Sequence, residues 1–499
     1  MSEAKSARTD RLVALGAVTS TLVLYLLTLC PTVFWYDSAE YVAAAVTRGV
    51  PHPPGYPLYT LLGWLFVQLP VDPAYAMNLF SALSAAIAVG FAYLIGRRLD
   101  LGQLGALVGA LTLGASRLFW SQSLIAEVYC PALALLLAVF LLLLRGARAD
   151  RPRVLVGAAF LAGLGLGLHL FIATCGLGLA VVVLGSGLRF ERPGDLRQLI
   201  SRQKLARRAG VAALCLLAAG IGAMIYLYIP WRASQSPELN FANPSTWDRF
   251  IWFVTGGNYK TWFLTDYDIS ARALKIGGII YDQFLIVGLL LVALGLVDLT
   301  RRLPLAALAI TLAVAGNIHF FFDYRVHDLE VFFLPTIALL CLLVGSGTHA
   351  AAALVKKALA EGPLSRMVPV MLAALAFFPP SLVLANYGAV DLSDYTAARD
   401  YGEALCRQLP KGAVIVNFTS PADWKNDAVF SKYFQIVLRK RRDVRVPRFV
   451  PAKTVLRLQR RGIAVFAYFP DPRIRKLFNV RKEGVIWRLG PPKIRPPRL

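Results

Sequence analysis

The sequence RLVALGAVTSTLVLYLLTLC, at residues 11–30, is an apolar run that carries no charge after its first residue. An α-helix rises about 1.5 Å per residue, so a run of about 20 residues crosses a hydrocarbon core of about 30 Å. No small-residue cleavage pattern accompanies it, which argues against a removed signal peptide. We therefore expect residues 11–30 to form the first membrane-spanning helix and to remain as an anchor.

The rest of the chain repeats this pattern. Hydrophobic residues make up 57% of the sequence and the mean hydropathy is +0.58, whereas soluble domains contain roughly 45–50% apolar residues. Apolar runs of spanning length predict about eleven transmembrane helices. These runs lie near residues 11–30, 75–96, 102–119, 128–144, 154–170, 172–188, 209–229, 275–298, 303–322, 331–349 and 367–386. The sequence thus predicts a polytopic α-helical membrane protein.

The formal net charge of +24 is explained by where the basic residues fall. Lysine and arginine cluster in alternate loops, as cytoplasmic loops do under the positive-inside rule. This explanation removes the need for a nucleic-acid partner. The six cysteines are scattered and show no spacing typical of a disulfide framework or a zinc site. The loops expected on the outer side are 31–74, 120–127, 230–274, 323–330 and the chain after about residue 387.

Beyond about residue 387 the apolar runs shorten to strand length and alternate with amphipathic helical stretches. We therefore expect a transmembrane module at residues 1–387 and a small extracytoplasmic α/β domain at residues 388–499. Its basic run RKRR, at 439–442, is either a solvated face or a contact for anionic headgroups. The expected strands are Ala413–Asn417, Ile463–Tyr468 and Gly484–Leu489, and the expected helices are Tyr395–Leu409 and Ala428–Leu438.

The first outer loop carries FWYDSAEY at residues 34–41 and PHPPGYP at residues 51–57. The stretches 38–47 and 56–69 predict two short helices that lie in the membrane interface. The prolines between them fix backbone angles and remove amide donors, so the linker should be a stiff bend around His52. A stiff bend can hold a side chain in a fixed position.

Asp37 and Glu40 are the first candidates for chemistry. They stand three residues apart, so they share one face of a helix that begins at Ser38. The same spacing is typical of a capping box, in which Asp37 accepts from the first-turn amides and Glu40 reaches back. The spacing alone favours capping, but a capping carboxylate can still turn its other oxygen into a cleft.

Further polar residues on the same outer side are candidates for substrate binding, although each has an ordinary structural explanation. A histidine in a turn, such as His52, is commonly packed or hydrogen-bonded. Glu127 begins a helix, where the dipole favours a carboxylate, and Arg232 can snorkel to the interface. What favours a binding role is that all of these residues fall on one side of the membrane. That topology was inferred from other residues. The candidates are His52, Tyr56, Glu127, Tyr129, His169, Arg232, Tyr259, Arg325, His327 and Asp328.

These segments together resemble the GT-C glycosyltransferases, and specifically their protein O-mannosyltransferase-like branch. The similarity covers nearly the whole chain, and HPPGYP is its most specific part. At residues 417–423 the sequence NFTSPAD departs from the Gly-Asp-Asn-like turn of the family. The matching segments are DSAE at 37–40, HPPGYPL at 52–58, EVY at 127–129, IPWR at 229–232 running through Asn243-Pro244 to Tyr259, DLEVFFLP at 328–335, NY at 386–387, LPKGA at 409–413 and RDV at 442–444.

The resemblance implies an inverting transfer of a sugar, with mannose favoured, from a polyprenyl-phosphate donor. The acceptor would be a hydroxyl of protein Ser or Thr, or of an envelope glycan or lipid, on the extracytoplasmic face of a bacterial inner membrane. A phosphate leaves without protonation by a strong acid, so one carboxylate suffices to take the acceptor proton.

Within this scheme we expect Asp37 to be the base and Glu40 to orient it or the acceptor. Arg232 is expected to stabilise the departing phosphate, with Arg325 or His327 as lesser candidates. The scheme requires no cofactor, but carboxylates near a phosphate can also hold a divalent cation, and the sequence leaves this open.

Two other classes of function compete with an enzyme. One is a transporter or flippase of a lipid-linked or anionic solute, and the other is a scaffold whose outer domain binds a partner. Transporters commonly show inverted repeats and broken helices at mid-membrane. The sequence shows no repeat, and its polar residues lie at one edge of the bundle instead, which favours the enzyme.

Overall fold

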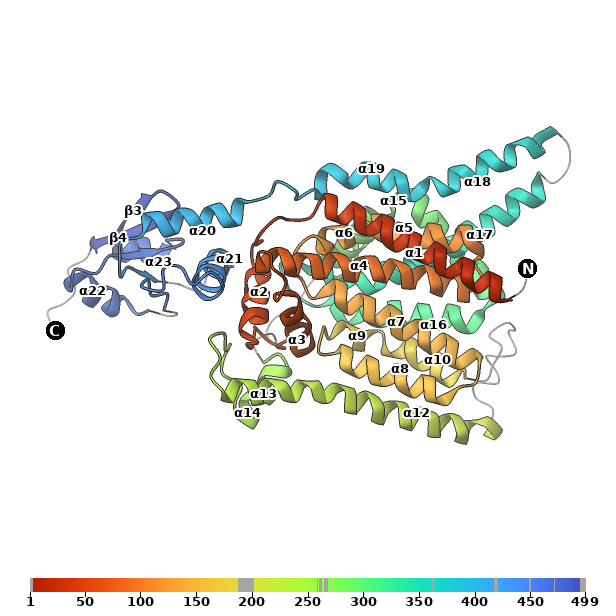
Figure 1. Cartoon of the computed structure of the whole chain (residues 1–499), viewed down its shortest axis with the longest axis horizontal. Coiled ribbons are helices and arrows are strands. Elements are labelled where there is room, and N and C mark those ends of the chain that lie inside the picture. Colours follow the sequence, from red (N-terminus) through yellow and green to blue (C-terminus); the bar gives the residue numbers. More distant parts are fainter. Residues whose placement is uncertain are drawn as a thin grey trace.

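In the computed structural model of the chain, the described residues are 3–186, 202–257, 259, 263, 268–359, 363–416, 421–447, 450–470 and 472–493. They form a bundle of long helices, with a smaller α/β part beyond one end of it (Figure 1). The helices of the bundle are α1 (Glu3–Leu27), α4 (Pro73–Arg98), α5 (Gly102–Ala115), α6 (Arg117–Ser123), α7 (Tyr129–Arg148), α8 (Pro152–Gly165), α9 (Phe171–Thr174), α10 (Gly176–Leu184), α12 (Arg202–Ala223), α13 (Tyr228–Ser234), α15 (Ile269–Arg302), α16 (Pro304–Phe322), α17 (Leu334–Ala358), α18 (Val368–Ala376) and α19 (Phe378–Val390).

Within the described residues, eight helices are long and apolar enough to cross a membrane, and a bent pair makes a ninth. This confirms a polytopic helical membrane protein. The expected count of about eleven is higher because it includes the runs 154–170 and 172–188. The first of these runs contains only the 14-residue α8, and α10, with nine residues, occupies the second.

The bent pair corrects the expected continuous span at 102–119. α5 ends at Ala115, and α6 leaves it at an angle of 62°. Ser116 between them is extended, with φ −66° and ψ 132°. The backbone N–H of Leu118 in the first turn of α6 donates to Gln283 Oε1 of α15 at 2.8 Å. A side chain from another helix therefore satisfies an amide that the bend leaves without an intrahelical partner.

Small residues allow the central helices to pack closely. A Cβ on Gly345 of α17 would lie 2.7 Å from the carbonyl oxygen of Gly105 in α5. Such close backbone approach is typical of helix contacts inside membranes. These close contacts hold the central helices in place, and the outer loops connect such helices.

Two outer-loop helices, α2 (Asp37–Thr47) and α3 (Pro57–Phe66), lie at the end of the bundle nearest the α/β part (Figure 1). The sequence predicted both as interfacial helices. α2 differs from that prediction, because residues Ser38 to Ala45 are all buried. The reason is that the chain covers its outer face with η5 (Ala428–Val437), a π-helix from the C-terminal part.

The C-terminal part contains a four-stranded sheet in the order β1-β2-β4-β3. β1 and β2 are parallel, and the other neighbouring pairs are antiparallel. The three expected strands are present as β1, β2 and β4, but β3 was not expected, since charged residues such as those of its RKE segment are uncommon in strands. The elements are α20 (Ala397–Gln408), β1 (Val414–Val416), α21 (Pro421–Asp427), η5, α22 (Ala452–Arg460), β2 (Val465–Ala467), α23 (Pro472–Leu477), β3 (Phe478–Glu483) and β4 (Ile486–Pro492).

This part is packed firmly onto the outer loops. Its Ile436 joins Ala43, Ala44 and Leu239 in one buried apolar cluster. The main apolar core runs without interruption from the bundle into α20 and η5. The domain boundary near residue 387 therefore stays a prediction.

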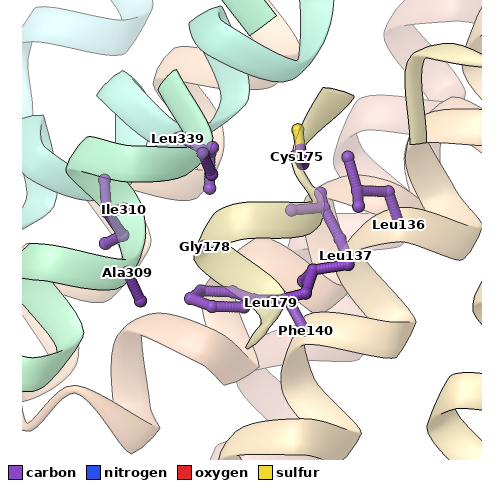
Figure 2. A pocket seen from close by; sticks show the side chains of 10 residues that line it. Leu136, Leu137, Phe140, Cys175, Gly178, Leu179, Ala309, Ile310 and Leu339 are labelled. Carbon is purple, nitrogen blue, oxygen red and sulfur yellow. The ribbon is translucent and has the colours of Figure 1, made fainter. Parts of the chain in front are cut away.

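An apolar crevice lies within the bundle between α7, α10, α16 and α17 (Figure 2). Leu136, Phe140, Gly178, Ala309 and Leu339 contribute to its walls, and the sulfur of a cysteine is its one heteroatom among the side chains (Figure 2). It offers no acid, base or hydrogen-bonding side chain. The chemistry must therefore be sought at the end of the bundle where α2 lies.

Candidate active site

The acidic pair does not form the capping box that its spacing favours. α2 begins at Asp37 itself, and its N-cap residue Tyr36 makes no side-chain cap. Tyr36 has φ 57° and ψ −130°, a conformation that costs roughly 1–3 kcal/mol in a non-glycine residue. Such strain is typical of functional sites. Both carboxylates are directed to tertiary partners instead.

Glu40 binds His52. The Oε2 atom of Glu40 lies 2.6 Å from Nδ1 of His52 and also accepts from the backbone N–H of His52 at 3.3 Å. The Glu40 side chain has no exposed surface. The proline bend thus carries His52 to the buried side chain of Glu40 in α2.

His52 is a buried cation between two carboxylates. Its Nε2 atom lies 3.7 Å from Oδ2 of Asp37. Burial alone would lower the pKa of His52, but the carboxylates of Asp37 and Glu40 outweigh it and raise the pKa to about 9. Burial likewise disfavours the Glu40 anion, yet the hydrogen bond and charge of His52 leave the pKa of Glu40 below its ordinary value. The pair is ionised at neutral pH.

Asp37 is the member of this group that a substrate can reach. Its side chain is 30% exposed. One oxygen, Oδ1, accepts a hydrogen bond from the indole N–H of Trp424 at 3.0 Å, while Oδ2 faces His52. Asp37 thus keeps an exposed edge, whereas Glu40 is buried and contacts His52.

An aromatic wall borders the group. The hydroxyl of Tyr56 lies 3.4 Å from His52 Nε2, and its ring stacks on that of His169 with centroids 6.0 Å apart. The ring of Tyr129 lies 5.2 Å from that of His169. His169 Nδ1 accepts from the backbone N–H of Phe171. Three predicted residues from three segments are thus brought to the His52 side of the site.

Two further acids complete the cluster. Burial, followed by the negative charge of Asp37, raises the pKa of Asp328 to about 6. Burial, followed by the charges of Asp37 and Asp328, raises the pKa of Glu127 well above its ordinary value. Tyr259 contacts the proline bend, since its hydroxyl donates to the carbonyl of Pro53 at 3.2 Å. Burial thus disfavours the Glu127 anion, while Asp37 and Glu40 both face His52.

Arg232 lies at the opposite end of α2 from Asp37. Its guanidinium donates to the carbonyls of Thr47 and Arg48, both at 2.9 Å, and to Gln235 Oε1. These carbonyls end α2, whereas Asp37 begins it, and an 11-residue helix is about 16 Å long at 1.5 Å per residue. Arg232 therefore caps the far end of α2, which a cation at a helix C-terminus favours.

Basic side chains do lie on the rim beside Asp37. The ammonium of Lys425 sits 4.3 Å from the ring centre of Trp35 and 5.8 Å from that of Tyr36. The exposed His327 also meets Tyr36, with ring centres 6.2 Å apart. Arg325 is exposed in the same loop. Lys425 and His327 thus both border the residue that precedes Asp37.

The sequence analysis missed the contribution of the C-terminal part. Two residues at the site, Trp424 and Lys425, come from α21. A third, Lys432, comes from η5, and its charge lowers the pKa of Glu40. A contact across 387 positions leaves no local pattern in the sequence. The departure from the family turn at 417–423 adjoins Trp424, but the side chains of that turn lie outside the described residues.

The same group fits a divalent cation. Asp37, Glu40 and His52 each offer one ligand atom, and these atoms lie within 4.8 Å of one another. Carboxylate oxygens and a neutral imidazole are suitable ligands. His52 must lose its proton before it can ligate, so a metal and a proton compete for this position.

Part of the chain is similar in sequence to known proteins. Residues 37–188 match the family model of the protein O-mannosyl-transferase TMEM260 N-terminal domain. A segment of 112 residues is 38% identical to protein O-mannosyl-transferase TMEM260 of Mus musculus and covers 22% of this chain and 16% of that protein. A segment of 114 residues is 31% identical to the tmem260 protein of Dictyostelium discoideum, with 22% and 14% covered. The matched segments are thus about a sixth or less of these relatives.

The similarity in fold extends over nearly the whole chain. The crystal structure of ArnT from Cupriavidus metallidurans bound to undecaprenyl phosphate superposes with a TM-score of 0.60 and 14% identity over 98% of both chains. The apo structure of the same protein gives 0.57 over 97% and 98%. The chain is therefore a polytopic membrane protein with the GT-C fold, and its resemblance to the protein O-mannosyltransferase-like branch is confirmed.

Proposed function

We propose that the protein is an inverting glycosyltransferase that moves a sugar from a polyprenyl-phosphate donor to an acceptor hydroxyl. The observation that carries the proposal is the partly exposed Asp37 beside a buried Glu40–His52 ion pair. One reachable carboxylate, held in place by charged groups that no substrate touches, is what a single-base transfer requires.

Asp37 would take the proton of the acceptor hydroxyl on Oδ2 as the oxygen attacks the anomeric carbon. The sugar–phosphate bond breaks on the opposite face of the sugar, so the configuration inverts. The phosphate keeps the bonding electron pair and leaves as an anion. The His52 side chain lies beside Oδ2, where its charge stabilises the negative charge of the carboxylate.

The departing phosphate would be stabilised by basic side chains at the rim. Lys425 and His327 both border Tyr36, and Arg325 is exposed in the loop of His327. Charge-assisted hydrogen bonds from these groups suit a phosphate. They replace Arg232, which caps α2.

The lipid donor is supported by the GT-C fold and by the ArnT structure, which holds undecaprenyl phosphate. The names of the TMEM260 relatives support mannose and protein hydroxyls, and an envelope glycan or lipid remains the second acceptor class. By the positive-inside rule the site and the C-terminal part face the extracytoplasmic side of a bacterial inner membrane.

A reconstituted assay tests this proposal against transport. The purified full chain in lipid nanodiscs would receive polyprenyl phosphate carrying radiolabelled mannose, together with exported proteins from a deletion strain. A transferase moves the label into protein or glycolipid and leaves free polyprenyl phosphate. Intact donor in the nanodiscs, combined with movement of the labelled lipid across liposome membranes, would instead identify a flippase.

A further inference from the structure

Trp424 of α21 is the one described residue from the C-terminal part that hydrogen-bonds Asp37. Its indole Nε1 lies 3.0 Å from Asp37 Oδ1. The ring also meets His52 edge to face, with centroids 6.4 Å apart and an interplanar angle of 88°. On another side it meets Phe241 of the second long outer loop at 6.3 Å. The indole is thus held between the acidic pair and a loop that follows α13.

We propose that Trp424 is a positioning residue for Asp37, so that the C-terminal part completes the active site. This inference rests on the proposed function. An indole N–H can donate but cannot accept, and it does not ionise at physiological pH. It therefore takes no part in proton transfer, and its effect is to fix which oxygen of Asp37 is free.

The geometry shows why Asp37 needs such a partner. Among the described residues its other polar contact is His52, at 3.7 Å, which is longer than a hydrogen bond. Without Trp424 the exposed carboxylate could rotate about its side-chain torsions. With Oδ1 held by the indole, Oδ2 stays beside the His52 cation and is available to the acceptor hydroxyl.

The C-terminal part is anchored well enough to hold Trp424 in this position. Tyr433 of η5 donates its hydroxyl to Asp72 Oδ2 at 2.6 Å. Arg439 and Arg442 both pair with Glu238 in the second long outer loop. Two residues of the basic run at 439–442 therefore tie the C-terminal part to this loop, although their side chains stay 51% and 59% exposed.

The test removes the N–H while keeping the ring. Replacing Trp424 by 3-benzothienylalanine substitutes sulfur for the N–H in a ring of nearly the same shape, and Trp424→Phe is the simpler variant. In the nanodisc assay, kcat should fall about 10-fold or more, because a hydrogen bond to a charged group is lost. The KM for the polyprenyl-phosphate donor should not change, because the indole does not bind it. Trp487→Phe, in β4 of the same part, should leave both constants unchanged.

A double-mutant cycle with Asp37→Asn separates positioning from packing. If Trp424 acts through Asp37, then removing its N–H should cost nothing further in the Asp37→Asn background. An unchanged kcat in the benzothienylalanine variant, or an equal loss with and without Asp37, would overturn the inference. Wild-type transfer by the Asp37→Asn single variant would instead overturn the proposed function itself. A normal thermal unfolding midpoint confirms that the isosteric variant is folded.

Discussion

At the scale of single residues, the site depends on how one buried cation is shared between two carboxylates. Glu40 and His52 form a short contact with no exposure of the glutamate, while Asp37 keeps an exposed edge. Breaking a buried pair leaves an uncompensated charge in a medium that solvates it poorly. The fixed ion pair thus gives Asp37 its electrostatic surroundings and makes α2 dependent on the proline bend.

Glu40→Gln should therefore destabilise the protein and reduce transfer together. The expected loss in the free energy of unfolding is about 3 kcal/mol, because the His52 cation loses its nearest anion. The midpoint of thermal unfolding and the transfer rate of the same preparation measure the two effects. The matched control is Glu403→Gln, which breaks an exposed pair with Arg399 and should cost under about 1 kcal/mol. Equal effects of the two substitutions would contradict a stabilising role of the buried Glu40–His52 pair.

The pH dependence of stability has a definite sign. Folding raises the pKa of His52 from 6.5 to about 9, so the stabilisation is complete below pH 6.5 and is lost as the pH rises through 9. The thermal unfolding midpoint of the wild type should fall across this window, and that of His52→Gln should fall less. Parallel curves for the two proteins would show that His52 is not a protonated partner of the acids.

Arg232→Met tests the corrected position of this arginine. Loss of its bonds to the carbonyls of Thr47 and Arg48 should lower stability by about 1 kcal/mol, while the KM for the donor stays constant. Gln235→Met, which removes its third partner, should have a smaller effect. A raised KM for the donor at unchanged stability would show that Arg232 binds the donor phosphate.

At the scale of elements, the sequence indicated which segments matter but not how they meet. The motifs of the first outer loop placed His52 in a stiff bend on the same side as the acidic pair, but the contact between His52 and Glu40 was not predicted. The cover of α2 by η5 could not be predicted, since it joins segments nearly 400 positions apart and rests on packing. The capping-box prediction was also wrong. Both carboxylates contact tertiary partners instead of the backbone amides at the start of α2.

Packing of α20 against η5 gives a test at this scale. A Cβ on Gly402 of α20 would overlap the ring of Phe434 in η5, whereas a Cβ on Gly388 of α19 meets nothing within 4 Å. Gly402→Ala should cost about 1–3 kcal/mol by overpacking and reduce transfer by displacing α21 and η5. Gly388→Ala should be neutral or slightly stabilising. If both variants match the wild type in unfolding and transfer, then η5 does not determine the site.

At the scale of the whole molecule, the chain is a helical bundle that presents one polar end. Hydropathy and charge were enough to predict the bundle, because the span length of a membrane helix is set by the bilayer. Three of the expected spans are not single regular helices in the described residues, because α8 and α10 are short and α5 bends into α6. Loops separated by hundreds of residues converge on Asp37, and this convergence carries the functional proposal.

The most direct measurement is the glycosylation of exported proteins and envelope glycolipids in a deletion strain that expresses Asp37→Asn. Asp394→Asn, which alters an exposed aspartate of the C-terminal part, is the control. With both variants at wild-type levels in the membrane, mass spectrometry should find the sugar restored by Asp394→Asn and absent with Asp37→Asn. Full restoration by Asp37→Asn would contradict the assignment of Asp37 as the base.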